Sequence, residues 1–213
     1  MKLFSINFIN KTIQVLLLFL FIINTAASFY MPLMAVFITQ HIIGASLATV
    51  GVAVAVYSII KSFIQVPLAK RLDSQAGEKD DFFVILTGGV IGIVYSFGFL
   101  LIHYVGQLYV LEIVSGIGDA CTMAAYYAIF SHHIDKNSEG FEWSLLSVGG
   151  LTVSTALGGV VGGFASQRFG FPVVFISAGF LNILGVFILV ILYPYIKILR
   201  QSRHYKTVTD EKK

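Results

Sequence analysis

A lysine, an aspartate, a glutamate and an asparagine interrupt long apolar runs in which charged side chains are otherwise rare. They are Lys61, Asp119, Glu112 and Asn24. A charged side chain at the middle of a lipid bilayer costs roughly 2.5–3.5 kcal/mol, so it usually faces a bundle interior or water and marks the path of an ion or solute. These residues are therefore the first candidates for chemistry in this chain.

Helix geometry brings three of these residues to one depth. With a rise of 1.5 Å per residue, Lys61 lies about 21 Å, and Asp119 about 18 Å, from the outer starts of their runs. Asn24 lies about 18 Å from the inner start of the first run. Opposite charges at one depth predict an ion pair between Lys61 and Asp119. Such a pair either only neutralises buried charge or belongs to a solute or proton site in a polar cavity.

Glu112 is a second acid on the helix face of Asp119, because the two are seven residues apart. It lies nearer the outside of the membrane. Either carboxyl group could carry a proton, and Glu112 is the freer candidate because a nearby cation would oppose protonation of Asp119. The sequence therefore allows proton coupling without requiring it.

The remaining polar residues form no pattern typical of an enzyme or a metal site. His132 and His133 are neighbours and do not share a helix face. The single cysteine, Cys121, excludes an intrachain disulfide framework and a cysteine cluster. The net charge of +3 is small and the basic residues lie at the ends of apolar runs, which argues against nucleic-acid binding. We expect no catalytic activity, no metal and no cofactor.

The elements that must position these residues are membrane helices. Hydrophobic residues make up 57% of the 213 residues and charged residues 12%, about half the charged share of a typical soluble domain. A helix needs about 20 apolar residues to cross the bilayer. The sequence therefore predicts an all-α membrane protein with six spans, at about 12–40, 47–70, 82–103, 107–131, 142–166 and 171–196. The first run is longer than the core of a signal peptide, so we expect a retained helix.

Twelve of the 14 lysine and arginine residues fall on one side of the membrane if the chain crosses it six times. The exceptions are Lys61, within a span, and Arg168, on the opposite side. Cytoplasmic segments are enriched in lysine and arginine. We therefore expect an integral protein of the plasma (inner) membrane with both termini in the cytoplasm. The segment 197–213 is basic and polar, and we expect it to be a disordered cytoplasmic tail.

Small residues recur every four positions in the fifth span. One stripe contains Gly158 and Gly162, and a second stripe beside it contains Gly159 and Gly163. Membrane helices associate through close approach at small residues. Each stripe thus predicts a helix contact, which is either static or a surface on which helices rock.

These spans resemble the major facilitator superfamily. The fifth span, from Ser154 to Gly163, resembles the family motif G-x-x-x-G-P-x-x-G-G, with Gly159 in place of the proline. Between spans two and three the family has G-x-L-A-D-R-x-G. There this chain keeps Arg71 and has Asp73 in place of the second glycine. In the fourth span, Glu112 replaces the arginine of R-x-x-x-G-x-G-x-A.

The resemblance implies one N-terminal-type half of a twelve-span transporter, built as two inverted three-span repeats. In such a half, spans one and four line a central cavity and spans two and five face the other half. Asn24, Glu112, Asp119 and Tyr126 would then point toward the solute. Arg71, Asp73 and the glycines of the fifth span would lie at the gating interface.

The function implied is secondary active transport of a small solute by alternating access. Six spans enclose only half a cavity, so we expect a homodimer or a second half-transporter chain in the bilayer. The alternative is a non-transporting six-span subunit or scaffold that retains the fold. Whether this chain is half of a longer transporter stays open at this point.

Overall fold

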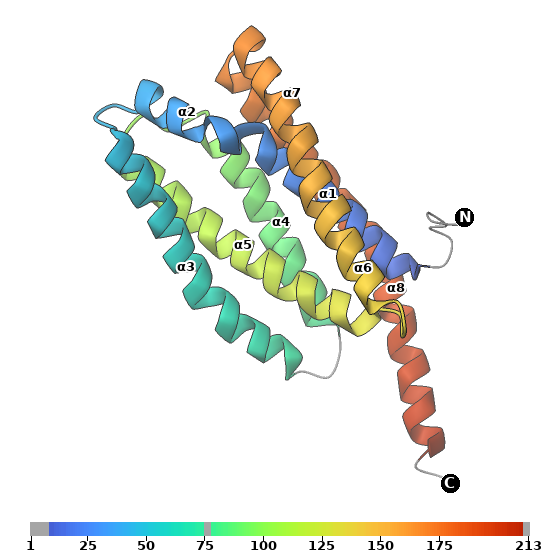
Figure 1. The fold of residues 1–213 in the computed structure, drawn as a ribbon. Helices are drawn as coiled ribbons and strands as arrows, with labels where there is room; N and C mark the ends of the chain where they lie inside the picture. The colour runs from blue at the N-terminus through green and yellow to red at the C-terminus, as the bar shows by residue number, and fades with distance from the viewer. Residues whose placement is uncertain (1–8, 75–77, 211–213) are drawn as a thin grey trace.

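The computed structural model describes residues 9–74 and 78–210, which form a bundle of long helices (Figure 1). Six helical segments among them are long and apolar enough to cross a membrane. The elements in chain order are α1 (Lys11–Tyr30), the 3-10 turn η2 (Met31–Leu33), α2 (Met34–His41), α3 (Leu47–Asp73), α4 (Lys79–Gly98), α5 (Val105–His133), α6 (Glu139–Leu145), the π-helical segment η3 (Leu146–Val153), α7 (Ser154–Phe169) and α8 (Phe171–Asp210).

Local sequence signals fix several helix ends. The Asn10 side chain accepts a hydrogen bond from the Thr12 amide at 2.9 Å and caps α1. Ser46 and Thr49 form a reciprocal capping box at the start of α3. Gly170, with φ +81°, supplies the left-handed conformation that ends α7 and allows α8 to begin. These caps satisfy backbone groups that would otherwise lack partners at the helix ends.

The first and fifth spans are each built from several elements. In the first span, α1 and α2 are joined by η2, which contains Pro32; proline cannot donate the backbone hydrogen bond that a continuous helix needs. In the fifth span, α6 and α7 are joined by the π-helical η3. A π turn inside an α-helix often lies at a functional site.

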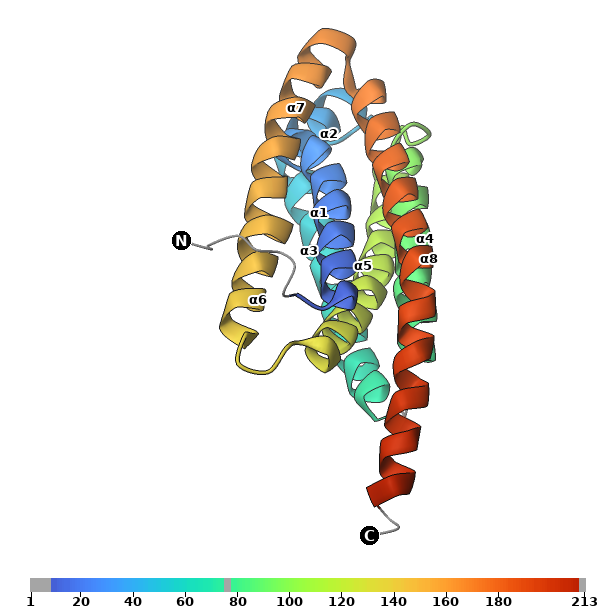
Figure 2. The same cartoon turned by 90° about the vertical axis from the view of Figure 1, so that its right-hand side faces the viewer.

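The helices pack in a pattern that repeats with a shift of three spans. Span four (α5) packs on span two (α3), and span one (α1) packs on span five (α7). Span three (α4) packs on span four, and span six (α8) packs on span one. Helices α4 and α8 lie side by side (Figure 2). The pattern is unchanged when spans one to three exchange with spans four to six, as expected for two inverted three-helix repeats.

Loops at each end of the bundle are tied together. At one end, the Ile43 amide donates to the His103 carbonyl at 2.8 Å. At the other end, the Asn10 amide donates to Asp135 Oδ2 at 3.1 Å. The third span ends at Gly98 rather than at the predicted His103, because residues 99–103 leave the helix to make the first of these contacts.

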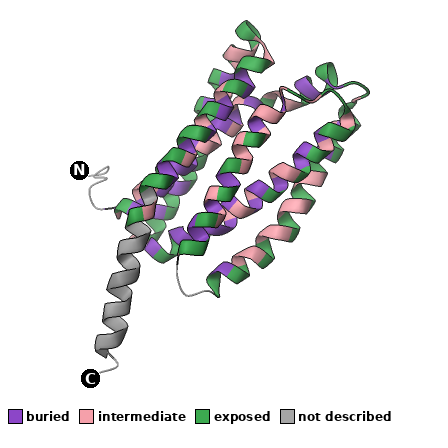
Figure 3. Ribbon diagram, turned by 180° about the vertical axis from the view of Figure 1, so that it is seen from behind, coloured by how far each residue is buried: buried purple, intermediate pink, exposed green. Residues whose placement is uncertain are grey.

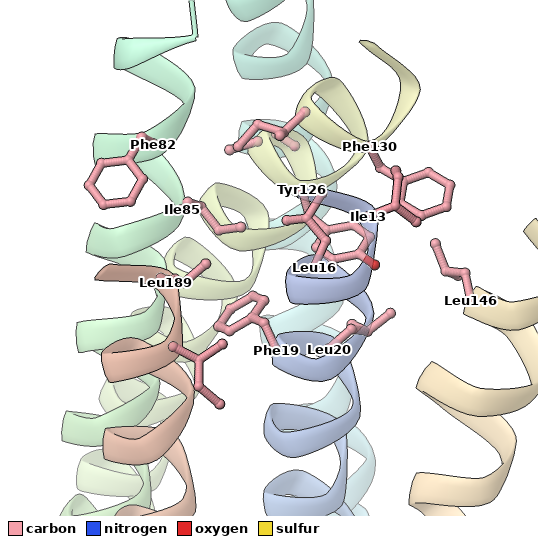
Figure 4. Close-up of a cluster of buried hydrophobic side chains, with 14 of the residues drawn as sticks. Ile13, Leu16, Phe19, Leu20, Phe82, Ile85, Tyr126, Phe130, Leu146 and Leu189 are labelled. Atoms are coloured by element: carbon pink, nitrogen blue, oxygen red, sulfur yellow. The ribbon is translucent and has the colours of Figure 1, made fainter. Parts of the chain in front are cut away.

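The apolar core is divided into two clusters. One cluster lies toward the end that carries Asn10 and contains Leu16, Phe19 and Phe130 (Figure 4). The second lies toward the opposite end and contains Phe37, Phe99 and Phe175. Four candidate residues belong to neither cluster. Along its helix, each lies between residues of one cluster and residues of the other: Asn24, Lys61, Glu112 and Asp119.

Burial is uneven among the helices. Helix α3 is mostly exposed or half-buried along its length (Figure 3). In its most apolar 18-residue stretch, 11% is buried, against 50% in the corresponding stretch of α5. Helices α3 and α7 lie at opposite edges of the bundle (Figure 1). Spans two and five therefore have free sides, which is the placement that the family resemblance implies.

One glycine stripe of the fifth span packs inside the bundle rather than at a free edge. A Cβ atom on Gly158 would lie 2.6 Å from the Thr25 carbonyl oxygen, and one on Gly162 would overlap the backbone of Phe29. Both glycines are buried against α1. The second stripe is free, because Gly163 has nothing within 4 Å and Gly159 meets only Pro32 at 3.8 Å. Gly158 and Gly162 thus form a helix interface with α1, and their role in gating stays a prediction.

Helix α8 continues to Asp210 (Figure 1). No proline or glycine follows Pro194 before residue 210, so no helix-breaking residue interrupts it there. The expectation of a disordered tail from residue 197 stays a prediction. Residues 211–213 lie outside the described part of the chain.

Two matched substitutions test the packing of α7 on α1. We expect Gly162→Ala to lower the free energy of unfolding by about 1–3 kcal/mol, because the added methyl group meets backbone that cannot move independently. Gly163→Ala makes the same chemical change one position along the helix and should stay within about 0.5 kcal/mol of wild type. Thermal unfolding in detergent measures both. Equal effects would contradict this assignment of the two faces.

Candidate functional site

The predicted ion pair is present between α3 and α5. Lys61 Nζ lies 2.6 Å from Asp119 Oδ2. The Tyr57 hydroxyl donates a hydrogen bond to the same carboxylate oxygen and accepts one from Lys61 Nζ at 3.2 Å. The side chains of Lys61 and Asp119 are 28% and 34% exposed. The pair is therefore accessible from one side and is not sealed in a dry core.

The local sequence explains how these three groups meet. Tyr57 and Lys61 are four residues apart on α3, so their side chains lie on one face one turn apart. Gly116 lies one turn before Asp119 on α5, and a Cβ atom there would be 2.9 Å from the Tyr57 carbonyl oxygen. The missing side chain lets the two helices approach closely enough for a short ion pair.

Glu112 occupies a separate and more buried position. Its side chain is 7% exposed and accepts a hydrogen bond from the Tyr95 hydroxyl of α4 at 3.1 Å. The Tyr95 ring packs edge-on against Tyr30 of α1, with ring centroids 6.0 Å apart. Within the described residues, Glu112 has no basic side chain in ion-pair contact. It is a carboxyl group held by a tyrosine among aromatic rings.

A small cavity with a mixed polar and apolar lining lies beside the ion pair. Its volume is about 90 Å³, and it is bounded by residues of α1, α4, α5 and α8, which is room for about three water molecules. Asp119 lines this cavity, but Lys61 and Glu112 do not. The polar residues of its wall are Tyr30, Tyr95, Ser115, Asp119, Thr122 and Asn182.

Asn24 lies at a different helix crossing. Its side-chain amide donates to Ser154 Oγ at 2.7 Å, to Thr155 Oγ1 at 2.9 Å and to the Leu151 carbonyl at 3.1 Å. These bonds join α1 to α7 and to the π-helical η3. Asn24 does not line the cavity beside Asp119, so the structure separates it from the other candidates.

Tyr126 lies in the apolar core. It is fully buried and packs in the first core cluster near Ile13 and Leu16 of α1 and Phe130 of α5 (Figure 4). Its hydroxyl has no hydrogen-bond partner among the residues that the structure describes. This differs from the solute-facing position that the resemblance implies, because α1 covers the face of α5 at this level.

The two residues of the motif between spans two and three are exposed at the end of α3. Arg71 and Asp73 make no side-chain ion pair with the described residues. The contact at this end is formed instead by Glu78, which lies 3.8 Å from His132 Nδ1 and 3.5 Å from His133 Nε2. It links the start of α4 to the end of α5.

Sequence reasoning missed three residues of the site. Tyr57 could have been found, because it lies one helical turn from an intramembrane lysine. Asn182 could have been found as an amide within the last span; its Nδ2 donates to Ser96 Oγ at 2.9 Å. Tyr95 had no such signal, since its role depends on how α4 packs against α5. Among the described residues, no group of three His, Cys, Asp or Glu side chains could hold a metal ion.

Comparison with known proteins gives one family match. The model of the family described as Major Facilitator Superfamily matches residues 16–209, which is well over half of the chain. A search of curated proteins finds no match.

Two tyrosine substitutions distinguish the core from the site. We expect Tyr126→Phe to leave the free energy of unfolding unchanged or raise it by about 1 kcal/mol, because it removes a buried hydroxyl without a partner. Tyr95→Phe, the matched change, should lower it by about 1–3 kcal/mol because Glu112 then loses the hydrogen bond that the Tyr95 hydroxyl donates. Thermal unfolding in detergent compares them. Greater destabilisation by Tyr126→Phe would place Tyr126 in a polar contact.

Proposed function

This chain belongs to the Major Facilitator Superfamily, and we propose that it moves a small solute across the membrane by secondary active transport with alternating access. It is an integral membrane protein of a transporter family. The observation that carries the proposal is the accessible Lys61–Asp119 pair beside a partly polar cavity. A pair that only neutralised charge would need neither a cavity nor an open side.

The solute path that we propose passes through the cavity that is bounded by residues of α1, α4, α5 and α8. Asp119 and Lys61 bind the solute or a proton. Glu112 is a second acid, and it contacts the cavity wall through the Tyr95 hydroxyl. Intramembrane carboxylic acids commonly serve in proton relays. The driving ion is therefore proposed to be a proton, and no bound cofactor is needed.

A second six-span unit completes the cavity in this proposal. The Lys61–Asp119 pair is about one-third exposed on the side of α3 and α5, and bare lipid is an unfavourable neighbour for charge. Either a second copy of the chain or a partner half would cover this side. Gly159, Gly163, Arg71 and Asp73 are free to contact that unit. We place the protein in the plasma membrane with both termini in the cytoplasm, following the distribution of basic residues.

A non-transporting subunit or scaffold is the second candidate. It is favoured by Arg71 and Asp73, whose side chains form no ion pair with described residues of the gate region. A scaffold would keep the helix packing but would have no use for the charged crossing. We propose no enzymatic activity for either reading.

Substitution of Asp119 separates these readings. In liposomes containing the purified protein, we expect Asp119→Asn to reduce uptake to the level of protein-free vesicles, because the Asp119 carboxylate that binds the solute is then missing. Uptake is measured with labelled methylammonium, glucose, glycine and lactate, with and without a pH gradient. Asp80→Asn is the matched control, because Asp80 is exposed at the start of α4, and it should transport normally.

A charge exchange tests whether the pair is only structural. The double variant Lys61→Asp/Asp119→Lys keeps one positive and one negative charge at the crossing. If it transports like wild type, the pair serves neutralisation alone and Asp119 is removed from the site. If wild type takes up none of the four solutes and its detergent particle has the mass of one chain, the scaffold reading replaces transport.

A further inference from the structure

We propose that the transported solute carries an ammonium group, and that Lys61 occupies the ammonium site when solute is absent. This inference rests on the proposed transport function and names the substrate class of the same site. The ammonium site consists of Asp119 Oδ2 and the Tyr57 hydroxyl. In the structure, the ammonium group of Lys61 occupies this site.

The contacts of Lys61 Nζ are those that any primary ammonium requires. An ammonium group has three hydrogen-bond donors and no acceptor. Here one carboxylate oxygen lies at 2.6 Å and one phenolic oxygen at 3.2 Å. The nitrogen lies beyond the hydroxyl edge of the Tyr57 ring, 5.5 Å from its centroid. The site thus supplies a counter-charge and two oxygen atoms for an ammonium group.

The adjoining cavity presents the acid and not the base. Asp119 is the charged residue of its wall, and Lys61 lies outside that wall. The rings of Tyr30 and Tyr95 add aromatic surface, and Tyr95 also holds the second acid, Glu112. A cation entering the cavity meets an attractive field, whereas an anion would first meet Asp119.

Exchange of one ammonium for another leaves the buried charge balanced. An unpaired carboxylate in a low-dielectric site is strongly unfavourable, and removal of one partner of a buried pair is costly. If a solute ammonium takes the place of Lys61, Asp119 keeps a cation throughout. Lys61 is 28% exposed and has a flexible stem, so its ammonium can turn toward the open side during exchange.

The size of the cavity limits the group that enters. A volume of about 90 Å³ holds a compact headgroup, and the rest of a larger solute would lie outside the cavity. The same tethered lysine acts as an internal competitor. When Lys61 occupies the site most of the time, only a small fraction of sites is free to bind solute. The apparent dissociation constant for solute then equals the intrinsic constant divided by that fraction.

The test measures binding of methylammonium to the purified full-length chain in detergent, by isothermal titration calorimetry, with acetate as the probe of opposite charge. We expect wild type to bind methylammonium and not acetate. Lys61→Met should bind methylammonium about tenfold more tightly, because the internal competitor is gone. Adding Asp119→Asn to Lys61→Met should abolish that binding. Lys79→Met, an exposed lysine at the start of α4, is the matched control and should behave as wild type.

Thermal unfolding is a second measurement, needed because Lys61→Met is expected to be less stable than wild type. Lys61→Met leaves Asp119 unpaired, so methylammonium should raise its thermal unfolding temperature more than that of wild type, since a ligand stabilises the state to which it binds. Lys61→Gln should show the same rescue. If both variants fail to fold, the wild-type titration decides: binding of methylammonium without acetate supports the inference, and no binding overturns it.

The outcomes separate this inference from the transport proposal. Weaker methylammonium binding by Lys61→Met, or acetate binding that requires Lys61, would overturn the ammonium inference and favour an anionic solute. Uptake of glucose or lactate by liposomes without methylammonium binding would leave transport standing and remove the ammonium inference. Methylammonium binding with the expected variants but no uptake of any solute would leave the ammonium site standing and remove transport.

Discussion

The cost of holding charge away from water constrains this structure more than any other term. An ionised side chain deep in a bundle must have a counter-charge, hydrogen bonds or water. Here Asp119 obtains Lys61 and Tyr57, and Glu112 obtains Tyr95. The consequences extend into the packing: Gly116 has no side chain because α3 must approach α5 closely at this level. The apolar core is also divided, because a single continuous cluster would leave no place for a polar layer.

Helices approach closely at both edges of the bundle, but the polar contacts differ between the two crossings. At the crossing of α5 and α3, the glycine is on α5 and the polar contact is an ion pair. At the crossing of α1 and α7, the glycines are on α7 and the polar contact is the amide of Asn24 with Ser154 and Thr155. These crossings correspond under exchange of the two three-helix repeats. A neutral hydrogen-bonded crossing has no charge to exchange, whereas the charged crossing has one. This difference supports our proposal that Lys61 and Asp119 bind the solute.

Depth along a helix could be predicted from the sequence, but the direction in which a residue faces could not. The Lys61–Asp119 pair followed from a fixed rise per residue, and the spans followed from apolar length. Tyr126 shares a face with Asp119 by periodicity, yet it is covered by α1 because the neighbouring helix crosses at that level. Gly158 and Gly162 show the same limit. Their four-residue spacing predicts a contact and does not name the partner, which is α1 of the same bundle. Tyr95 is part of the site only through the packing of α4, which no local pattern encodes.

The Lys61–Asp119 pair is about one-third exposed, and this exposure constrains which surroundings are possible on the α3–α5 side. A hydrocarbon layer of about 30 Å places a residue at mid-depth roughly 15 Å from either surface, and long basic side chains reach water from helix ends rather than from the centre. Lys61 therefore cannot place its ammonium in the headgroup region, and its exposed fraction of 28% must meet polar groups or water. Tyr57 covers one side of the ammonium, and Asp119 the other. The remaining side of the ammonium calls for a polar surface or water, and this requirement supports our proposal that a second bundle faces the α3–α5 side.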